Sequence, residues 1–149
     1  FSPLRRPVRR WPERLLRSAM WRLGLRFRKH DPRLPGRPDA SFPKARVAVF
    51  VDGDFWHGRK WAETGKLPDT NPEFWRRKFN GNLARDAKAD RALSDMGWLS
   101  LRIWESDIRK HPVACARLVR AIISRRRREQ RSDVAADGLR HGRGDAVAD

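Results

Sequence analysis

Two aspartates, an aromatic pair and a histidine follow one another closely in the stretch RVAVFVDGDFWHGRKW, residues 46–61. The stretch begins as an apolar, β-branched run that is typical of a buried central strand, and its polar residues come where that strand ends. A carboxylate such as that of Asp52 is a hard oxygen ligand, which is the kind that Mg²⁺ prefers. The neutral imidazole of His57 can accept a proton from a water molecule. The stretch therefore offers a candidate metal ligand and a candidate general base.

Another carboxylate comes earlier, where Asp39 ends the motif LPGRPD. A short strand is predicted over 39–42, and a tight turn joins it to the strand that ends at Asp52. Because the two strands are neighbours, we expect Asp39 and Asp52 to meet at one edge of the sheet and, with a strand-end carbonyl, to share one Mg²⁺ ion. Such an ion can activate a water molecule and neutralise charge on a scissile phosphate. Each residue also has a purely structural interpretation, because Asp39 can fix a turn, Asp52 stands in a common turn dipeptide, and an isolated histidine is often a surface residue.

The elements that must position these residues can be predicted from hydrophobic periodicity and turn residues. The stretch LRFRK is a candidate short strand, residues 58–71 are typical of a polar loop, and Asn80-Gly81 is expected to break a helical region. The predicted order of helices and strands indicates an α/β fold, with a small mixed β-sheet flanked by helices. The main elements are a helix over 12–23, strands over 39–42 and 46–51, helices over 72–79 and 82–96, a strand over 98–105 and a helix over 112–128.

The composition indicates a polyanionic partner. The chain has 149 residues, which fits one domain, and 35 basic against 18 acidic side chains give a net charge of +17. So strong a positive field favours nucleic acid, ahead of an anionic membrane or the ribosome. A single cysteine excludes a disulfide framework and a cysteine-based zinc site, which suits a reducing cytoplasm. No apolar run approaches the length of a membrane span, and no secretion signal is visible, so we expect no membrane partner.

Charge and hydrophobic content divide the chain into three predicted segments. Residues 1–11 form a basic N-terminal arm, which is expected to lie along phosphates and to make binding strongly salt-dependent. Residues 12–128 form the folded domain. Residues 129–149 have little to bury and are predicted to be disordered.

Six motifs occur in one order along the chain: PERLLR, LRFR, LPGRPD, VFVDGDFWHG, PEFWRRKFNGNLARD and GWLSLRIWE. In type and order they closely resemble the very-short-patch-repair (Vsr) DNA endonucleases, over about residues 12–108. The resemblance implies a restriction-endonuclease-like fold of the PD-(D/E)xK superfamily and a Mg²⁺-dependent nick in one DNA strand. The implied substrate is a T·G mismatch left by deamination of 5-methylcytosine, cut on the 5′ side of the mismatched thymine.

The resemblance assigns roles to individual residues at matching positions. Asp39 matches the metal-binding aspartate, and the backbone carbonyl of Val51 matches the second metal contact. His57 matches the histidine that activates water. Glu13 and Asp86 match acidic residues that support the site. Asp86 is expected to orient His57, because a carboxylate on one imidazole nitrogen fixes the tautomer and raises the basicity of the other nitrogen.

Five further positions match residues that contact DNA. Phe55, Trp56 and Trp75 match rings that wedge into the base stack beside the mismatch, where a weak pair costs less to unstack than a normal one. Lys78 and Asn82 match residues that hydrogen-bond the mismatched bases. Without the resemblance, packing in the core is the ordinary interpretation of each of these tryptophans.

The chain departs from the best-known members of the family in two places. Those members hold a structural zinc ion, whereas the matching positions here are Asp54, Arg59, Trp61 and Ser106, which are not a set of soft ligands. We therefore expect no structural zinc, with an Asp54–Arg59 salt bridge and apolar packing by Trp61 in its place. At Asp52 the best-known members carry a histidine, so the aspartate is expected to bind the metal directly.

The expected function is therefore a Mg²⁺-dependent nicking endonuclease that acts on double-stranded DNA at T·G mismatches, as a monomer at the bacterial nucleoid. Mismatch-repair proteins are candidate partners. Two other functions stay open, namely a nuclease of a restriction–modification system with another target and a DNA-binding module that does not cleave. The presence of Asp39, Asp52, His57 and Asp86 argues against the second, because a binding module needs none of them.

Overall fold

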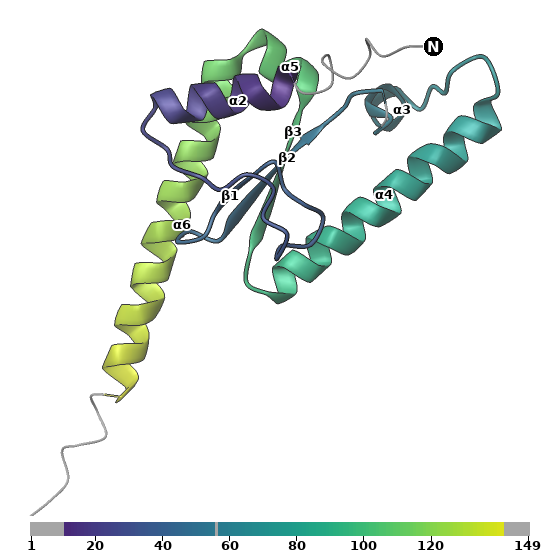
Figure 1. Cartoon of the computed structure of the whole chain (residues 1–149). Helices are drawn as coiled ribbons and strands as arrows, with labels where there is room; N and C mark the ends of the chain where they lie inside the picture. The colour runs from purple at the N-terminus through teal and green to yellow at the C-terminus, as the bar shows by residue number, and fades with distance from the viewer. Residues whose placement is uncertain (1–10, 56, 142–149) are drawn as a thin grey trace, which may run out of the picture.

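A three-stranded β-sheet lies between helices in the computed structural model, which describes residues 11–55 and 57–141 (Figure 1). The α/β arrangement that the sequence predicts is confirmed, and each strand begins and ends within about one residue of its predicted limits. The elements are α2 (Trp11–Arg22), β1 (Ala40–Phe42), β2 (Val47–Asp52), α3 (Arg59–Thr64), α4 (Pro72–Asp95), β3 (Leu99–Trp104), α5 (Glu105–Lys110) and α6 (Pro112–His141).

The sheet is mixed, with β2 in the middle. β2 pairs antiparallel with β1, where Ala40 lies opposite Val49, and parallel with β3. A parallel pair needs a long crossover connection, and α4 is the main part of the connection between β2 and β3. Because β2 and β3 run in the same direction, their carboxyl ends lie at one end of the sheet, where Asp52 stands opposite Trp104.

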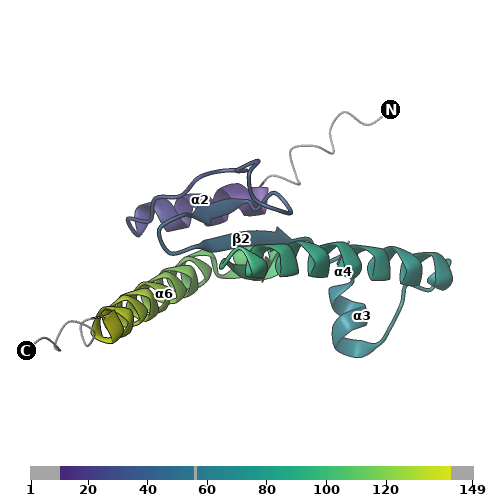
Figure 2. The same ribbon diagram turned by 90° about the horizontal axis from the view of Figure 1, so that it is seen from below.

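Side chains alternate across β2, so its two faces belong to two separate cores. Val47 and Val49 pack into the larger core, which residues of α2, α5 and α6 complete. Ala48 and Phe50 face the other side, where they pack with Leu93 of α4. Figure 1 shows the sheet between α6 and α4, and Figure 2 shows the same elements from below. Asp52 follows Phe50 by two residues and so projects toward α4.

α4 runs without interruption through Gly81, where the sequence predicts a break. Glycine in a helix costs about 1 kcal/mol relative to alanine. That cost is smaller than the gain from burying Phe79 and Leu93, which lie on either side of Gly81 in the same helix. The predicted break is therefore wrong, and one rigid helix connects the region after β2 to the start of β3.

Two smaller elements also differ from the prediction. The stretch 58–71 contains the short helix α3, in which Arg59 and Glu63 form an ion pair at 2.9 Å one turn apart. The stretch LRFRK forms only an isolated bridge, between Arg28 and Ser41, rather than a strand. Within the described part of the chain, no helix has the length and apolar character that a membrane span requires.

α6 continues to His141, although the sequence predicts disorder over 129–149. The tail is therefore helical over 129–141, and its remainder lies outside the described residues, as does the arm over 1–10. Ion pairs at i, i+4, with distances of 3.1 and 3.5 Å, link exposed side chains of this helix. Such pairs stabilise a helix that buries little surface. Figure 1 shows the end of α6 projecting away from the sheet.

Candidate active site

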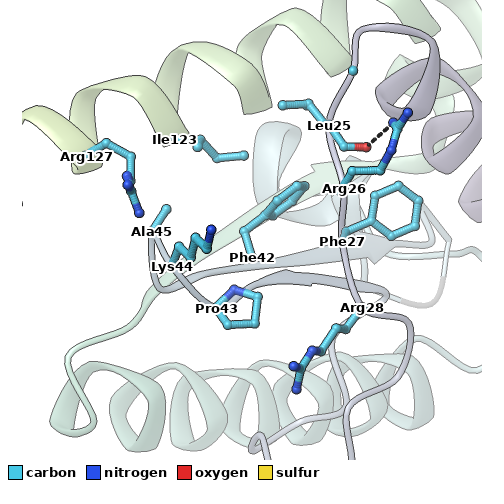
Figure 3. A pocket seen from close by; sticks show the side chains of 11 residues that line it. Leu25, Arg26, Phe27, Arg28, Phe42, Pro43, Lys44, Ala45, Ile123 and Arg127 are labelled. Carbon is cyan, nitrogen blue, oxygen red and sulfur yellow. Dashed lines mark hydrogen bonds between the residues drawn. The ribbon is translucent and has the colours of Figure 1, made fainter.

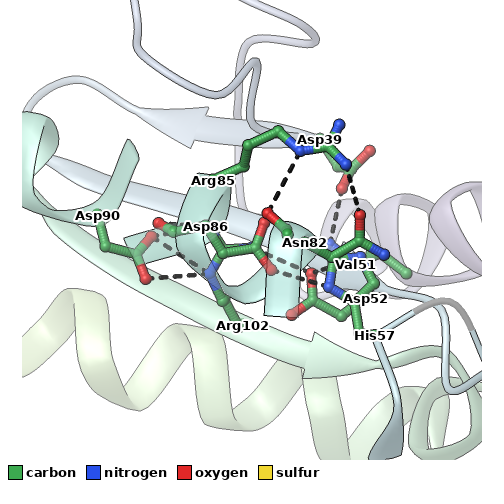
Figure 4. A network of polar contacts seen from close by, with 10 residues as sticks. Asp39, Val51, Asp52, His57, Asn82, Arg85, Asp86, Asp90 and Arg102 are labelled. Atoms are coloured by element: carbon green, nitrogen blue, oxygen red, sulfur yellow. Dashed lines mark hydrogen bonds and ion pairs between the residues drawn. The ribbon is translucent and has the colours of Figure 1, made fainter. Parts of the chain in front are cut away.

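His57 lies between two carboxylates at the carboxyl end of β2 (Figure 4). Its Nδ1 is 2.8 Å from Oδ2 of Asp86, a hydrogen-bond distance, and its Nε2 is 3.9 Å from Oδ1 of Asp52, which is too long for one. Asp86 comes from α4, so the helix and the strand end converge on the loop that carries the histidine. The Asp86 carboxylate favours the tautomer protonated at Nδ1, which leaves Nε2 able to accept a proton. This is the contact that the sequence predicts between Asp86 and His57.

Asp39 belongs to a second group of ligand atoms. Its Oδ2 accepts the backbone N–H of Val51 at 2.7 Å. Ligand atoms of Asp39, His30 and Glu13, which comes from α2, lie within 4.8 Å of one another. Burial raises the pKa of Asp39 to about 6, because it outweighs the lowering by the Val51 amide, and the negative charge of Glu13 adds to the rise. A divalent cation would relieve the electrostatic repulsion between these two carboxylates. Their hard oxygens are ligands of the kind that Mg²⁺ prefers.

Asp39 and Asp52 fall into different ligand groups, and the expectation that they share one ion stays a prediction. Asp39 is held by the amide of Val51 and lies near Glu13, whereas Asp52 contacts Arg102 of β3. The separation reflects their neighbours: Glu13, the carboxylate beside Asp39, comes from α2, whereas Asp86 of α4 and Arg102 of β3 lie beside Asp52. The two aspartates still interact electrostatically, because the charge of Asp52 raises the pKa of Asp39 further. The structure therefore offers two ligand groups instead of one.

A guanidinium lies inside the group that contains Asp52 (Figure 4). Nη1 of Arg102 is 3.1 Å from Oδ1 of Asp52 and 3.4 Å from Oδ1 of Asp86. Its Nη2 is 2.8 Å from Oδ1 of Asp90, and its Cζ lies 4.3 Å from the ring centroid of Phe50. Burial lowers the pKa of Arg102, but the hydrogen bond to Asp90 and the surrounding carboxylate charges raise it above its ordinary value. Arg102 therefore remains a cation at the centre of three carboxylates.

Sequence reasoning missed Arg102, Asp90 and His30 as residues of the site. The sequence does carry a signal for Arg102 and Asp90. Arg102 is the only charged residue of the strand LSLRIW. Asp90 also stands one helical turn after Asp86, so the two carboxylates share a helix face. His30 follows the candidate strand LRFRK, whose sequence gives no signal that its end lies beside Asp39.

Two glycines allow α4 to pack directly against the loops that carry the site. Gly58 has a φ of +62°, and an added Cβ would lie 2.8 Å from Cγ of Phe79. Gly36, in the motif LPGRPD, has a φ of +77°, and an added Cβ would lie 2.9 Å from the nearest atom of α4. Backbone conformation and close contact therefore both exclude a side chain at these positions. The same helix thus fixes the loop of His57 and the loop that leads to Asp39.

The predicted base-contacting residues follow one face of α4. Trp75, Lys78 and Asn82 lie at i, i+3 and i+7, and Asp86 follows four residues later, so their side chains project on one side of the helix. Asn82, Asp86 and His57 line one pocket of about 330 Å³. Lys78 is exposed, one turn before Asn82. This face therefore leads along the surface to the imidazole of His57.

Aromatic rings cluster where the loop of His57 meets the start of α4. The ring centroids of Phe55 and Trp75 are 4.9 Å apart, and those of Trp75 and Phe79 are 5.8 Å apart. Phe79 is buried and anchors the cluster, whereas Phe55 and Phe74 are 51% and 58% exposed. Exposed rings beside a polar pocket suit contact with flat nucleobases. Trp56, the other predicted wedge residue, lies outside the described residues.

Comparison with known proteins identifies the family of this chain. The family described as DNA mismatch endonuclease Vsr matches residues 9–63. The type II nicking enzyme V.NmeDIP of Neisseria meningitidis serogroup C is 45% identical over 112 residues, which cover 75% of this chain and 76% of the relative. V.HpaIIP, the type II nicking enzyme of Haemophilus parainfluenzae, is 42% identical over 101 residues, which cover 68% and 72%. The chain belongs to the Vsr family of DNA endonucleases.

Another relative is the DNA mismatch endonuclease Vsr of Escherichia coli, which is 38% identical over 97 residues. These residues cover 65% of this chain and 62% of the relative. The matched segment of the family, residues 9–63, contains Glu13, Asp39 and His57. Asp86 and Arg102 lie beyond it, on α4 and β3. The relatives support a DNA endonuclease, and the predicted family is confirmed.

Asp54, Arg59, Trp61 and Ser106, the residues from which the sequence predicts folding without zinc, make contacts with one another and with α4. Nη1 of Arg59 is 3.3 Å from Oδ2 of Asp54, which is the predicted ion pair. Ser106 of α5 joins both, because its backbone N–H donates to Asp54 Oδ1 at 3.0 Å and its Oγ accepts from Arg59 at 2.7 Å. Trp61 stacks on Phe79 with ring centroids 5.8 Å apart. These contacts tie the region after β2 to α5 and α4, and folding without zinc stays a prediction.

A separate pocket of about 530 Å³ lies on the α6 side of the sheet (Figure 3). Phe27, Phe42 and Ile123 line it with apolar surface, while Arg28 and Arg127 add positive charge. None of the predicted site residues lines it. The candidate chemistry of the Vsr-family enzyme therefore lies at the carboxyl end of β2, apart from this pocket.

Proposed function

We propose that this Vsr-family endonuclease nicks one strand of double-stranded DNA at a T·G mismatch, on the 5′ side of the thymine, in a Mg²⁺-dependent reaction. The observation that carries the proposal is the hydrogen bond of 2.8 Å between His57 and Asp86, because Asp86 lies on the same face of α4 as Trp75. A mismatch-nicking enzyme needs a hydrolytic centre and a surface that responds to weak base pairing. In this chain α4 contributes to both.

His57 is the proposed general base of the reaction. It takes the proton of the attacking water at Nε2, while Asp86 accepts the hydrogen bond from Nδ1–H at 2.8 Å. The negative charge of Asp86 stabilises the imidazolium that forms. The pocket of about 330 Å³ that His57, Asn82 and Asp86 line gives this water a polar site.

The Mg²⁺ ion is proposed to bind at Asp39. Asp39 and Glu13 offer carboxylate oxygens within 4.8 Å of each other, and the backbone carbonyl of Val51 is the proposed third ligand. When bound, the ion supplies positive charge that neutralises the scissile phosphate and polarises its water. The amide of Val51 holds the Asp39 carboxylate at 2.7 Å, so this ligand is oriented by the sheet itself.

Selectivity for the mismatch is proposed to come from the aromatic cluster and the α4 face. A T·G pair is easier to unstack than a normal pair, so insertion of the exposed Phe55 ring costs less energy there. Lys78 and Asn82 offer hydrogen-bond donors along the same helix face, which suits contacts with base edges. The net charge of +17 supplies the attraction to phosphates that any duplex experiences.

The test uses end-labelled duplexes that are identical except for one pair, which is T·G, T·A or another mismatch. We expect a nick 5′ of the thymine in the T·G duplex only, and only with Mg²⁺. His57→Ala is expected to slow nicking by about 10²- to 10⁴-fold, because proton transfer is lost. His141→Ala, at the far end of α6, is the matched control and should nick normally. Cleavage of the T·A duplex would indicate a nuclease with another target, and binding without a nick would indicate a DNA-binding module, so either result would overturn the proposal.

A further inference from the structure

The guanidinium of Arg102 occupies a position that neither the family resemblance nor the proposed mechanism explains. It projects from the middle of β3, and its side chain is only 21% exposed. It contacts Asp52, Asp86 and Asp90, which come from β2 and α4. A planar guanidinium has a fixed fork of donors, so it can hold several carboxylates in a defined arrangement.

We propose that Arg102 is a positioning residue for His57 and the resident cation of the Asp52–His57–Asp86 group. The divalent ion of the site then binds only at Asp39. This inference rests on the proposed nicking activity for its kinetic test, but its structural and metal-binding tests do not depend on that activity.

The positioning role follows from how the two oxygens of Asp86 are used. Oδ2 lies 2.8 Å from Nδ1 of His57, and Oδ1 lies 3.4 Å from Nη1 of Arg102. The same Nη1 is 3.1 Å from Oδ1 of Asp52, the carboxylate on the other side of the imidazole. One guanidinium nitrogen therefore sets the distance between the two carboxylates that flank His57. Without it, their mutual repulsion is uncompensated and Asp86 is free to rotate away from Nδ1.

The role as resident cation follows from the same contacts. A metal ion bound to Oδ1 of Asp52 and Oδ1 of Asp86 would need the space and the lone pairs that Nη1 of Arg102 already uses. The two positive charges would also repel each other within a partly buried site. At Asp39 the guanidinium of Arg17 donates to the backbone carbonyl at 3.3 Å, and among the described residues no guanidinium hydrogen bond to the Asp39 carboxylate is found, so its oxygens remain available. The Asp39 group is therefore open to a cation and the Asp52 group is not.

The kinetic test compares Arg102→Met, Arg102→Lys and the control Arg125→Met in single-turnover nicking at saturating enzyme and Mg²⁺. Arg125 pairs with Glu129 at 3.1 Å on the exposed part of α6, so its change removes a guanidinium far from His57. We expect a loss of about 10- to 100-fold in rate for Arg102→Met, with little change in DNA affinity. Arg102→Lys keeps the charge without the fork, so its rate should lie between the two. Arg125→Met should stay within about twofold of the wild type.

Two measurements without DNA cover the case in which a variant is merely unstable. Imidazole ¹⁵N spectra should show the Nδ1–H tautomer of His57 in the wild type and a mixture in Arg102→Met, in samples that thermal unfolding shows to be folded. Mn²⁺ titration followed by electron paramagnetic resonance should give one ion per wild-type chain, lost in Asp39→Asn, and a second ion in Arg102→Met.

Three results would overturn the inference. They are an unchanged nicking rate in Arg102→Met, an unchanged His57 tautomer in that variant, and a wild-type ion that survives Asp39→Asn but is lost in Asp52→Asn. If the wild type nicks none of the duplexes while the tautomer and Mn²⁺ results are as expected, the proposed function fails and the role of Arg102 stands.

Discussion

His57 and Asp86 are 29 residues apart in sequence, and a hydrogen bond of 2.8 Å joins their side chains. Asp86→Asn keeps the size of the side chain but removes the charge that stabilises the imidazolium. We expect the single-turnover nicking rate of the Vsr-family enzyme to fall by about 10- to 100-fold, with DNA affinity maintained. Asp95→Asn, an exposed change at the end of the same helix, is the control. If the two variants lose the same rate, the loss reflects the charge of α4 in folding or DNA binding. Asp86 would then have no special role in orienting His57.

The raised pKa of Asp39 predicts how the Mg²⁺ requirement depends on pH. Burial raises this pKa to about 6, so the carboxylate is protonated below that pH and cannot bind a cation. The Mg²⁺ concentration that gives half-maximal nicking should therefore rise by about tenfold for each pH unit below 6. Titrations at several pH values between 5 and 8 measure this. A requirement that does not change with pH would remove Asp39 from the metal site.

The same shift predicts a gain in stability when Asp39 is neutralised. Its folded-state pKa of about 6 lies above the ordinary value of 3.8, so the folded state holds the proton more tightly and stability falls as the pH rises between these values. Asp39→Asn should therefore be more stable above pH 6 by about 1–2 kcal/mol, a figure reduced for solvent screening. Thermal unfolding in EDTA at pH 7.5 and pH 4 tests this, because the gain should be present at the first and absent at the second.

The fold could largely be predicted because its central elements carry strong local patterns. The apolar run of β2 and the alternation of β3 gave both strands nearly their observed limits. The uninterrupted α4 could not be predicted, because local sequence shows the cost of Gly81 but not the burial of Phe79 and Leu93 beside it. The helical end of α6 was missed for a related reason, since ion pairs between exposed residues are weak signals.

Part of the candidate site was predictable from the sequence, but the grouping of its residues was not. The contact between His57 and Asp86 followed from the family resemblance, and the structure contains it. The structure places Asp39 and Asp52 in different ligand groups, and this grouping depends on Glu13 of α2 and Arg102 of β3, which are distant in sequence from both aspartates. Arg102 was missed because its role depends on the register between β2 and β3, which becomes known only in three dimensions.

From the contacts of Asp54 with Arg59 and Ser106 we predict that the protein folds without zinc. We also predict that its free energy of unfolding falls at acidic pH. Burial raises the pKa of Asp54, but hydrogen bonds from Ser106 and Arg59 lower it below the ordinary 3.8. The network should therefore stabilise the fold above pH 4, and that contribution is lost as the pH falls through the lowered pKa. Arg59→Met should lower the free energy of unfolding measured in urea at pH 7, because Asp54 loses its cationic partner. Metal analysis of the purified enzyme should find no stoichiometric zinc, and unfolding caused by a chelator would contradict the prediction.

The exposed ring of Phe55 predicts a change in mismatch discrimination without loss of the hydrolytic centre. Phe55 is 51% exposed and packs edge-on against Trp75 at 4.9 Å, so its outer face can stack on a base while its inner face is supported. Loss of one stacking ring costs about 1–3 kcal/mol of binding free energy. The cost is larger for the T·G duplex than for the T·A duplex, because the mismatched pair is easier to unstack. For Phe55→Ala we therefore expect the affinity ratio between T·G and T·A duplexes to fall by about tenfold. Trp21→Ala, which removes a 54% exposed ring on α2, is the control, and an unchanged ratio in Phe55→Ala would make Phe55 a packing residue.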